Sequence, residues 1–353
     1  MPYQRTDSFH TLLAKAKGHF KDRLPFVLYR KPFKNTVTAI FQKTDRLFHV
    51  DNFTESGFIF VPFDWQGEKV LLWPDEINTA VLYQDFKVAS KEVVLSSEGK
   101  ATYEALFQKA KHQIERGELR KVVLSRRVEV PIVKNGLELF GKMLAKYQNA
   151  FCYVWYHPKI GQWMGATPEV LLEANGDNIE TVSLAGTQKV TSTSQPTWTE
   201  KELEEQRLVT DFIKNCYSEN LESVSVSKAE SIRAGTLWHL KSRISGVKST
   251  EFSMDDLLRQ LHPTPAVCGL PKATAFEFLQ KHEGYGRQYY TGFLGELNLT
   301  SDDNAHLFVN LRCLQIKNKK AMIYVGGGIT SKSEAAQEWT ETQNKSLTML
   351  ELL

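Results

Sequence analysis

The chain has 353 residues, of which 42% are apolar and 24% are charged, a mixture typical of globular proteins with a sizeable core. Its 44 basic and 41 acidic side chains leave a net charge of +3, which argues against nucleic-acid and membrane partners. The four cysteines are widely separated, no two histidines have zinc-ligand spacing, and neither a secretion signal nor an apolar stretch of membrane-spanning length is visible. We therefore expect a cytoplasmic protein with free thiols.

The first part of the chain predicts a sheet. Short β-type runs, such as Gly57–Phe63 and Val70–Trp73, are separated by Gly, Pro, Asp and Asn. A change in pattern at Ser96–Gly99 is the only candidate boundary. We therefore assign residues 1–95 to a β-rich N-terminal part and residues 96–353 to a second region of the same fold.

From Thr102 the pattern becomes that of an amphipathic helix, with Tyr103, Phe107 and Ile114 on its apolar stripe. A β-branched run, 121–130, predicts the strand that follows. Further strands are expected at 150–156, 180–184, 292–299, 306–316 and 321–325, and helices at about 200–217, 253–260, 273–281 and 334–350. Hairpin-like links such as Lys317–Lys320 favour an α+β fold, in which helices flank a large, mostly antiparallel sheet assembly.

Two pairs of glutamates are the most informative charged residues. Glu202 and Glu205 lie in one expected helix, and Glu338 and Glu341 lie in another. The i, i+3 spacing of each pair places both carboxylates on one helical face. If the two faces met across a cavity, they would form an oxygen-only cage, which suits Mg2+.

Each pair also has a structural interpretation. Thr199-x-x-Glu202 is a capping-box signature, in which the glutamate bonds back to the start of its helix. Glu341 and Lys345 have the i, i+4 spacing of ion pairs on exposed helices. Spacing alone does not decide between a cage and these two roles.

The glycine run Gly326–Gly328 lies between the strand expected at 321–325 and the helix expected at 334–350. Successive glycines in a loop let backbone N–H groups approach an anion closely. Neither a Walker lysine nor a complete G-x-G-x-x-G accompanies the run. A carboxylate ligand is therefore favoured over a nucleotide.

Four other residues are candidates for the same site. Lys121 begins a rigid strand, but it can act as a base only if burial or nearby cations lower its pKa. Glu169 ends the turn-like segment Gly165–Glu169, where an acid is commonly unremarkable. Arg312, inside the strand expected at 306–316, needs either a carboxylate ligand or an internal salt bridge. His262 opens a rigid His-Pro-Thr-Pro turn that is more often structural than catalytic.

Taken in order, these segments resemble the chorismate-utilising enzymes: isochorismate synthases, salicylate synthases, anthranilate synthase component I and aminodeoxychorismate synthase. The resemblance covers about residues 100–350 and implies the anthranilate synthase component I fold, with a chorismate-binding catalytic region at 96–353. The matching stretches are Lys121–Arg126, Gly165–Glu169, Leu184–Thr187, Lys201–Glu205, His262–Ala266, Tyr290–Gly292, Leu311–Arg312, Gly326–Ile329 and Glu338–Lys345.

Within this family, Lys121 resembles the isochorismate and salicylate synthases, whereas the aminating members usually have glutamine there. Aminodeoxychorismate synthases tend to have a nucleophilic lysine where this chain has Ala185. The resemblance therefore favours the isochorismate synthase branch, and no glutaminase subunit is expected.

The resemblance also implies roles for individual residues. Lys121 would be the general base that activates water, and Glu169 the general acid near the leaving hydroxyl. Glu205 and Glu341 would be the principal Mg2+ ligands, with Glu202 and Glu338 holding the metal less directly. Contacts with chorismate are implied for Arg312 and Tyr290 at the pyruvyl carboxylate, for Lys345, Gly327 and Gly328 at the anionic end, and for Gly186, Thr187 and His262 around the ring.

These expectations describe an Mg2+-dependent isochorismate synthase, an isomerase that serves menaquinone or siderophore biosynthesis. A salicylate synthase, which forms isochorismate and then eliminates pyruvate, is one alternative. A non-catalytic chorismate-binding protein is another, although it would need to have lost an acid, a base or a metal ligand.

Overall fold

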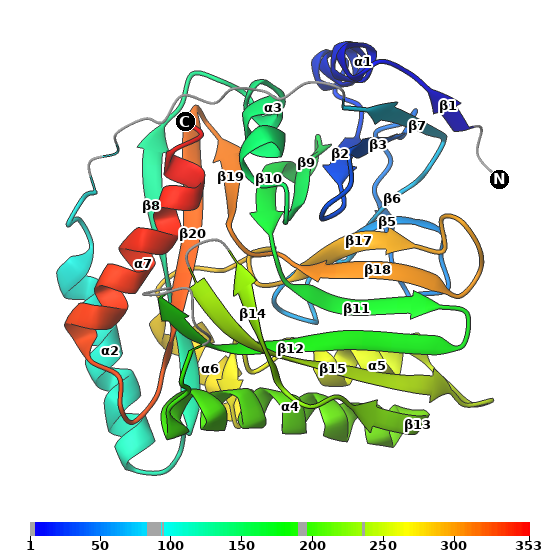
Figure 1. Ribbon diagram of the computed structural model, residues 1–353. Coiled ribbons are helices and arrows are strands. Elements are labelled where there is room, and N and C mark those ends of the chain that lie inside the picture. Colours follow the sequence, from blue (N-terminus) through cyan, green and yellow to red (C-terminus); the bar gives the residue numbers. More distant parts are fainter. Residues whose placement is uncertain (1–3, 83–92, 94, 190–195, 235–236) are drawn as a thin grey trace.

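The computed structural model describes residues 4–82, 93, 95–189, 196–234 and 237–353. These residues form two sheets with helices around them (Figure 1). Strands β1 (Gln4–Thr6) and β7 (Glu76–Val81) pair in parallel, and every other described strand pair is antiparallel. The predicted α+β fold, a large and mostly antiparallel sheet assembly flanked by helices, is confirmed.

The first sheet contains ten described strands, which come from both the early and the late parts of the sequence. Its order is β1-β7-β3-β2-β9-β10-β19-β20-β8-β16. The bounds of its remaining strands are β2 (Phe26–Arg30), β3 (Thr36–Phe41), β8 (Lys121–Pro131), β9 (Phe151–His157), β10 (Gly161–Thr167), β16 (Gly269–Leu270), β19 (Cys313–Lys317) and β20 (Lys320–Ile329).

The second sheet has the order β13-β15-β12-β11-β18-β17-β5-β6-β4, and β14 pairs with β15 beside this path. Strands from the first hundred residues therefore contribute to both sheets. The boundary predicted at 95–100 adjoins residues 83–92 and 94, outside the described part, and stays a prediction. The bounds are β4 (Phe48–His49), β5 (Gly57–Val61), β6 (Val70–Leu72), β11 (Val170–Asn175), β12 (Asn178–Lys189), β13 (Leu221–Val226), β14 (Glu230–Ala234), β15 (Leu237–Lys248), β17 (Phe293–Leu297) and β18 (Asn304–Val309).

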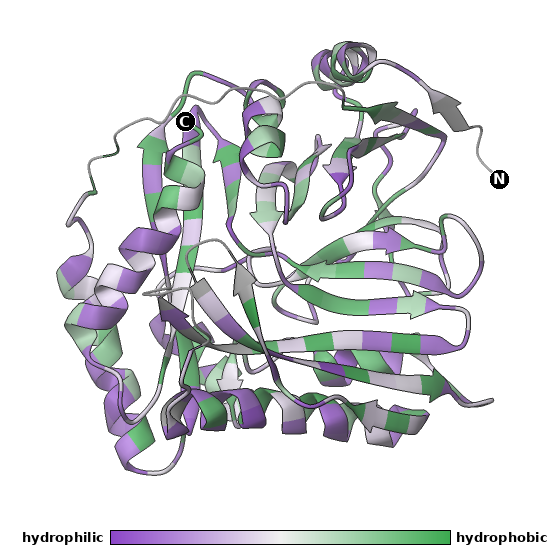
Figure 2. Cartoon of the chain, in the orientation of Figure 1, coloured by the Kyte–Doolittle hydropathy of each residue, from purple (hydrophilic) through white to green (hydrophobic). Residues whose placement is uncertain are grey.

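Helices pack on the sheets in three groups. α1 (Phe9–Lys21) and α3 (Gly136–Lys146) pack on the first sheet, while α4 (Glu200–Asn220), with α5 (Met254–Leu261) against it, packs on the second. The third group, α2 (Lys100–Glu115), α6 (Lys272–His282) and α7 (Ala335–Leu350), packs on the β8, β20 and β16 end of the first sheet. Hydrophobic and hydrophilic residues alternate along the ribbon of α4, as expected for a half-buried helix (Figure 2). No described helix combines the length and apolar character needed to cross a membrane.

An aromatic core lies between the two sheets. Trp155 of the first sheet meets Phe60 of the second with 5.1 Å between ring centroids, and Phe151 stacks on Phe308 at 4.2 Å. Large rings bury much area and prefer such stacked or edge-on geometries. This core holds the sheets together beside the places where the chain passes from one to the other.

The chain passes between the sheets several times, and two of these passages are neighbours. It leaves the first sheet between β10 and β11, at Pro168 and Glu169, and returns between β18 and β19, at residues 310–312. The single strand expected at 306–316 was therefore wrong. Arg312 lies at this break with a left-handed φ of 47°, which ends the extended conformation.

The two passages are hydrogen-bonded to each other. The Ala166 N–H donates to the Arg312 carbonyl at 3.0 Å, and the Val309 N–H donates to the Glu169 carbonyl at 3.0 Å. Side chains at both passages are therefore held at the junction of two rigid sheets.

The glycine run does not form the expected loop. Gly326, Gly327 and Gly328 continue β20 and pair with Ser125, Leu124 and Val123 of β8. The ladder satisfies backbone groups that a loop would leave free, so the strand extends to Ile329. The missing side chains instead leave space for groups from neighbouring elements.

Candidate functional site

Lys121 is the first residue of β8, beside the glycine run on β20. A Cβ at Gly328 would lie 2.9 Å from Lys121 Cε, so the glycine leaves room for the lysine stem. Burial lowers the pKa of the Lys121 ammonium, while the carboxylates of Glu205 and Glu169 oppose that change. The direction is the one that a lysine base requires.

Glu169 lies in the passage between β10 and β11 and interacts electrostatically with this lysine. Burial raises the pKa of its carboxyl to about 7, although Lys121, Arg312 and Lys345 all favour the charged form. A carboxyl with this pKa is substantially protonated near neutral pH and can therefore act as an acid. Glu169 lies between two strands, whereas Gly165–Thr167, expected as part of the same turn, belong to β10.

Arg312 and Tyr290 lie near Glu169 and Glu341. Burial lowers the pKa of Arg312, and the nearby Tyr290, Glu341 and Glu169 oppose this. Tyr290 is buried, and a Cβ at Gly326 would lie 2.9 Å from its hydroxyl. The site therefore combines a guanidinium and a phenol, both of which can donate to a carboxylate ligand.

The α7 glutamates converge on the middle glycine of the run. A Cβ at Gly327 would lie 3.1 Å from Glu338 Oε2 and 3.8 Å from Glu341 Oε1. Glu338 is only 8% exposed, unlike an ordinary surface acid. Glu341 makes the predicted i, i+4 ion pair with Lys345 at 2.5 Å, and Lys345 Nζ also donates to the Gly326 carbonyl at 2.8 Å.

Tyr103 of α2 approaches the same place and was not predicted as a site residue. A Cβ at Gly327 would lie 3.9 Å from its hydroxyl, which is buried and makes no hydrogen bond within the described structure. Burial raises the pKa of Tyr103, and the charges of Glu338 and Glu341 raise it further. The sequence signal was a hydroxyl-bearing ring on an otherwise apolar helical stripe.

The α4 glutamates differ from each other. Glu202 forms the predicted capping box, because the Thr199 N–H and hydroxyl both donate to its Oε2, the N–H at 2.9 Å. Burial alone would raise the pKa of Glu202, but these hydrogen bonds hold it below its ordinary value. Glu205 favours the charged form of Lys121 more strongly than any other carboxylate does. Of the two α4 glutamates, Glu205 is therefore the one with a marked electrostatic effect on the lysine.

No three His, Cys, Asp or Glu side chains of the described residues surround a common metal position. The four glutamates are thus not gathered into one cage. Nevertheless, the carboxylate oxygens of Glu338 and Glu341 converge where a Cβ at Gly327 would intrude, and they are the hard oxygen donors that Mg2+ takes. This donor set fits Mg2+, with Glu205 as the candidate from α4, and the complete ligand set stays a prediction.

The remaining predicted residues lie in two places. His262 Nε2 lies 2.9 Å from the Pro62 carbonyl, and burial lowers the pKa of its ring to about 4. This neutral histidine joins the turn after α5 to the segment after β5, in agreement with its structural interpretation. Gly186 and Thr187 lie at a register shift in β12, but their side-chain environment is outside the described part of the structure.

A buried ion pair is hydrogen-bonded to the backbone of β8, the strand that begins with Lys121. Arg287 and Glu283 are 2.5 Å apart, and each side chain is 2% exposed. Arg287 also donates to the Val123 carbonyl at 2.6 Å, while the Ser125 N–H donates to Glu283 at 2.8 Å. The sequence signal was an i, i+4 pair of opposite charge just before Tyr290, which was not recognised.

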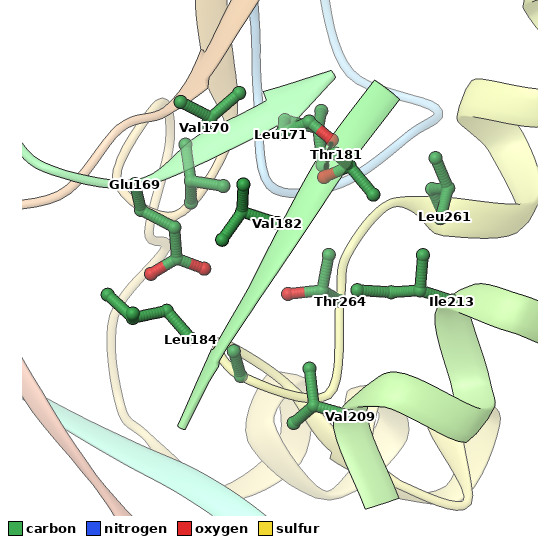
Figure 3. A pocket seen from close by; sticks show the side chains of 12 residues that line it. Glu169, Val170, Leu171, Thr181, Val182, Leu184, Val209, Ile213, Leu261 and Thr264 are labelled. Atoms are coloured by element: carbon green, nitrogen blue, oxygen red, sulfur yellow. Dashed lines mark hydrogen bonds between the residues drawn. The ribbon is translucent and has the colours of Figure 1, made fainter. Parts of the chain in front are cut away.

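Glu169 also lines a small pocket (Figure 3). Its volume is about 10 Å³, and nine of its twelve lining residues are apolar. Glu169, Thr181 and Thr264 supply its polar side chains. The full lining is Glu169, Val170, Leu171, Thr181, Val182, Leu184, Val209, Ile213, Leu261, Thr264, Ala266 and Val309.

Comparison with known proteins shows what this chain is similar to in sequence and in fold. Isochorismate synthase EntC of Escherichia coli K12 is 26% identical over 310 residues, which are 83% of this chain and 76% of the relative. The structure of DhbC from Bacillus anthracis superposes with a TM-score of 0.79 at 21% identity, covering 97% of this chain and 98% of that one. Anthranilate synthase component I from Streptococcus pneumoniae superposes with a TM-score of 0.69 at 20% identity, covering 92% of each chain.

The matches include isochorismate synthases and anthranilate synthase component I, two of the four groups named in the predicted resemblance, and the two solved structures have the predicted fold. The family model described as chorismate binding enzyme matches residues 3–351, nearly the whole chain. This protein therefore belongs to the family of chorismate binding enzymes.

Proposed function

We propose that this protein is an Mg2+-dependent isochorismate synthase, which converts chorismate to isochorismate. The observation that carries the proposal is the pair formed by Lys121 and Glu169. Burial lowers the pKa of the lysine and raises that of the glutamate to about 7. A neutral lysine and a protonated carboxyl are the forms needed for a general base and a general acid.

The proposed reaction uses these two groups in one displacement. Lys121 Nζ takes a proton from a water molecule as the water oxygen bonds to C2 of chorismate. Both ring double bonds shift, the bond from C4 to its hydroxyl breaks, and Glu169 donates the proton with which that oxygen leaves as water. Atoms balance because one water enters and one departs, so the reaction is an isomerisation.

The remaining site residues orient the substrate. Arg312 and Tyr290 offer donors for the pyruvyl carboxylate, and Lys345 supplies a further cation near Glu341. Glu205 and Glu341 would be the principal ligands of Mg2+, with Glu202 and Glu338 holding it less directly, and the ion would neutralise the ring carboxylate. Relatives named isochorismate synthase support this activity.

Product analysis tests the proposal. Purified protein is incubated with chorismate, with and without Mg2+, and the products are separated by chromatography. Isochorismate that forms only with Mg2+ is the expected result. Salicylate with stoichiometric pyruvate would instead identify a salicylate synthase, and chorismate binding without turnover would identify a non-catalytic protein.

Variants of the two central residues test the mechanism. Lys121→Met and Glu169→Gln keep the side-chain size and should each reduce turnover by about 10^2 to 10^4-fold. Lys134→Met and Glu251→Gln, at exposed positions, are matched controls that should retain full turnover. Normal turnover in both central variants would contradict the assigned roles.

A further inference from the structure

We propose that the pocket lined by Glu169 holds one ordered water molecule, which hydrogen-bonds the Glu169 carboxyl and the Thr264 hydroxyl and makes Thr264 a positioning residue for the acid. The water site follows from the structure of the pocket. The effect on catalysis rests on the proposed function of Glu169.

The first observation is an unsatisfied hydroxyl. Thr264 lies between α5 and β16 and is 7% exposed. Its Oγ1 is buried and makes no hydrogen bond with the described residues, whereas the Thr264 backbone carbonyl accepts from the N–H groups of Val267 and Cys268. Leaving a buried hydroxyl without a partner is costly, so a ligand that satisfies it is favoured.

The second observation is the direction in which the polar groups point. In Figure 3 the Thr264 hydroxyl points into the pocket towards the side on which the Glu169 carboxylate lies. Val182 and Leu184 form apolar walls around this space. The Thr181 hydroxyl already donates to the Leu171 carbonyl at 2.8 Å. Thr264 is therefore the pocket hydroxyl whose proton is free to serve a ligand.

The third observation is the size of the space. A volume of about 10 Å³ is roughly that of one water probe, and a buried water needs two to four polar partners. Thr264 and Glu169 supply two. The pocket is too small for an organic ligand, and one carboxylate with one hydroxyl is too few ligands for a cation. Water is the occupant that fits both the volume and the chemistry.

The water would act on Glu169 in addition to its charged neighbours, none of which lines the pocket. Lys121, Arg312 and Lys345 are the charged groups that act on this carboxyl, and all three favour its ionised form, while burial opposes them. A water that accepts from Thr264 and donates to Glu169 reduces the desolvation of the carboxylate. It also fixes the orientation of the carboxyl towards the substrate.

Variants of Thr264 test the catalytic effect. Thr264→Val keeps the shape but leaves the pocket apolar, so the pKa of Glu169 should rise further. The alkaline limb of the kcat profile should then move up by about one half to one pH unit, with KM for chorismate unchanged. Thr264→Ser keeps the hydroxyl and should retain the original midpoint. An unchanged or lowered midpoint in Thr264→Val would overturn the proposal.

Thr181→Val is the matched control, because it removes a pocket hydroxyl whose proton is already donated to a carbonyl. Its midpoint should match that of the unmodified protein, and an equal shift in both valine variants would remove the special role of Thr264.

A high-resolution crystal structure tests the water itself, even if a variant fails to fold. We expect an ordered water within about 3.2 Å of both Thr264 Oγ1 and a Glu169 carboxyl oxygen. A dry pocket would overturn the proposal. An ordered water in a protein that does not convert chorismate would overturn the proposed function and leave the water site standing.

Discussion

The two glutamate pairs have the same spacing but different environments. On α4, Glu202 is bound to Thr199 at the helix start, and Glu205 is the one with a marked electrostatic effect on Lys121. On α7, both carboxylates converge on Gly327, and Glu338 is buried there. The i, i+3 spacing fixes the helical face of a side chain, whereas the packing of that face decides its role.

The difference arises from what each helix packs against. α4 packs on β12 and β15. Glu202 lies in the first turn of this helix, where backbone N–H groups have no partner within the helix. α7 packs on β20, where three consecutive residues lack side chains. Carboxylates can approach that strand closely because no Cβ intervenes. Substitutions in the α4 pair and in the α7 pair should therefore differ in how strongly they affect helix stability and metal binding.

The largest expected effect is on metal affinity. Glu205→Ala and Glu341→Ala should each weaken Mg2+ binding by more than about 100-fold, because each would remove a direct ligand. Glu202→Ala should weaken it much less, since its carboxylate is held by the helix cap. Isothermal titration calorimetry with MgCl2 measures all three. If Glu202→Ala had the greatest effect, the distinction between the two α4 residues would be wrong.

The next effect concerns the charge state of two carboxyls at neutral pH. The pKa of Glu202 is held below its ordinary value, whereas that of Glu169 is raised to about 7. Because a general acid must be protonated, turnover should fall about tenfold per unit as the pH rises above 7. The kcat profile should lose this limb in Glu169→Gln and keep it in Glu202→Gln. A limb that persists in Glu169→Gln would assign it to another group.

Gly327→Ala tests the close approach on α7. Its Cβ would meet Glu338 Oε2 at 3.1 Å, so the carboxylate must move, and we expect about a tenfold loss of Mg2+ affinity. Gly141→Ala is the matched control, because no atom lies within 4 Å of its added Cβ. In the interior of α3 it should stabilise the protein by about 1 kcal/mol. Equal Mg2+ affinity in both variants would show that the approach to Gly327 is unimportant.

The smallest effect is on the α4 cap. Glu202→Ala should reduce the free energy of unfolding by about 1 kcal/mol, whereas Glu202→Gln keeps a capping-box side chain and should cost less. Because the folded pKa is lowered, the ionic part of this stability is present above the unfolded pKa and is lost as pH falls through the folded value. Urea unfolding at pH 7 and pH 3 measures both. A larger cost for glutamine than for alanine would exclude the cap.

Several elements were predictable because their signals are local. The helix with Tyr103, Phe107 and Ile114 on one stripe became α2, where all three are buried. The link Lys317–Lys320 forms the predicted hairpin, with Asn318 and Lys319 at positive φ. The capping box at Thr199 likewise needs only neighbouring residues. These features are determined by residues that lie close together in the sequence.

The missed features depend on residues far apart in the sequence. The helices α1 and α3 were not predicted, although Ser8 and Asn135 cap them. The break at Arg312 was also missed, because the chain there leaves the second sheet for the first, where β18 pairs with the distant β11 and β19 pairs with the distant β10. Likewise, the glycine run reads as a loop until its pairing with β8 is known.

The sequence by itself determined the residue types of the site and their order: a lysine opening a strand, an acid after a turn, two i, i+3 glutamate pairs and an arginine among apolar residues. These were enough to identify the family, because spacing and side-chain chemistry are local properties. Only the tertiary structure decided which groups meet. The pKa changes of Lys121 and Glu169, the place of Glu338 at Gly327 and the pocket beside Thr264 all require burial by segments distant in the chain. Burial is a property of the packed sheets and helices, and no single segment contains it.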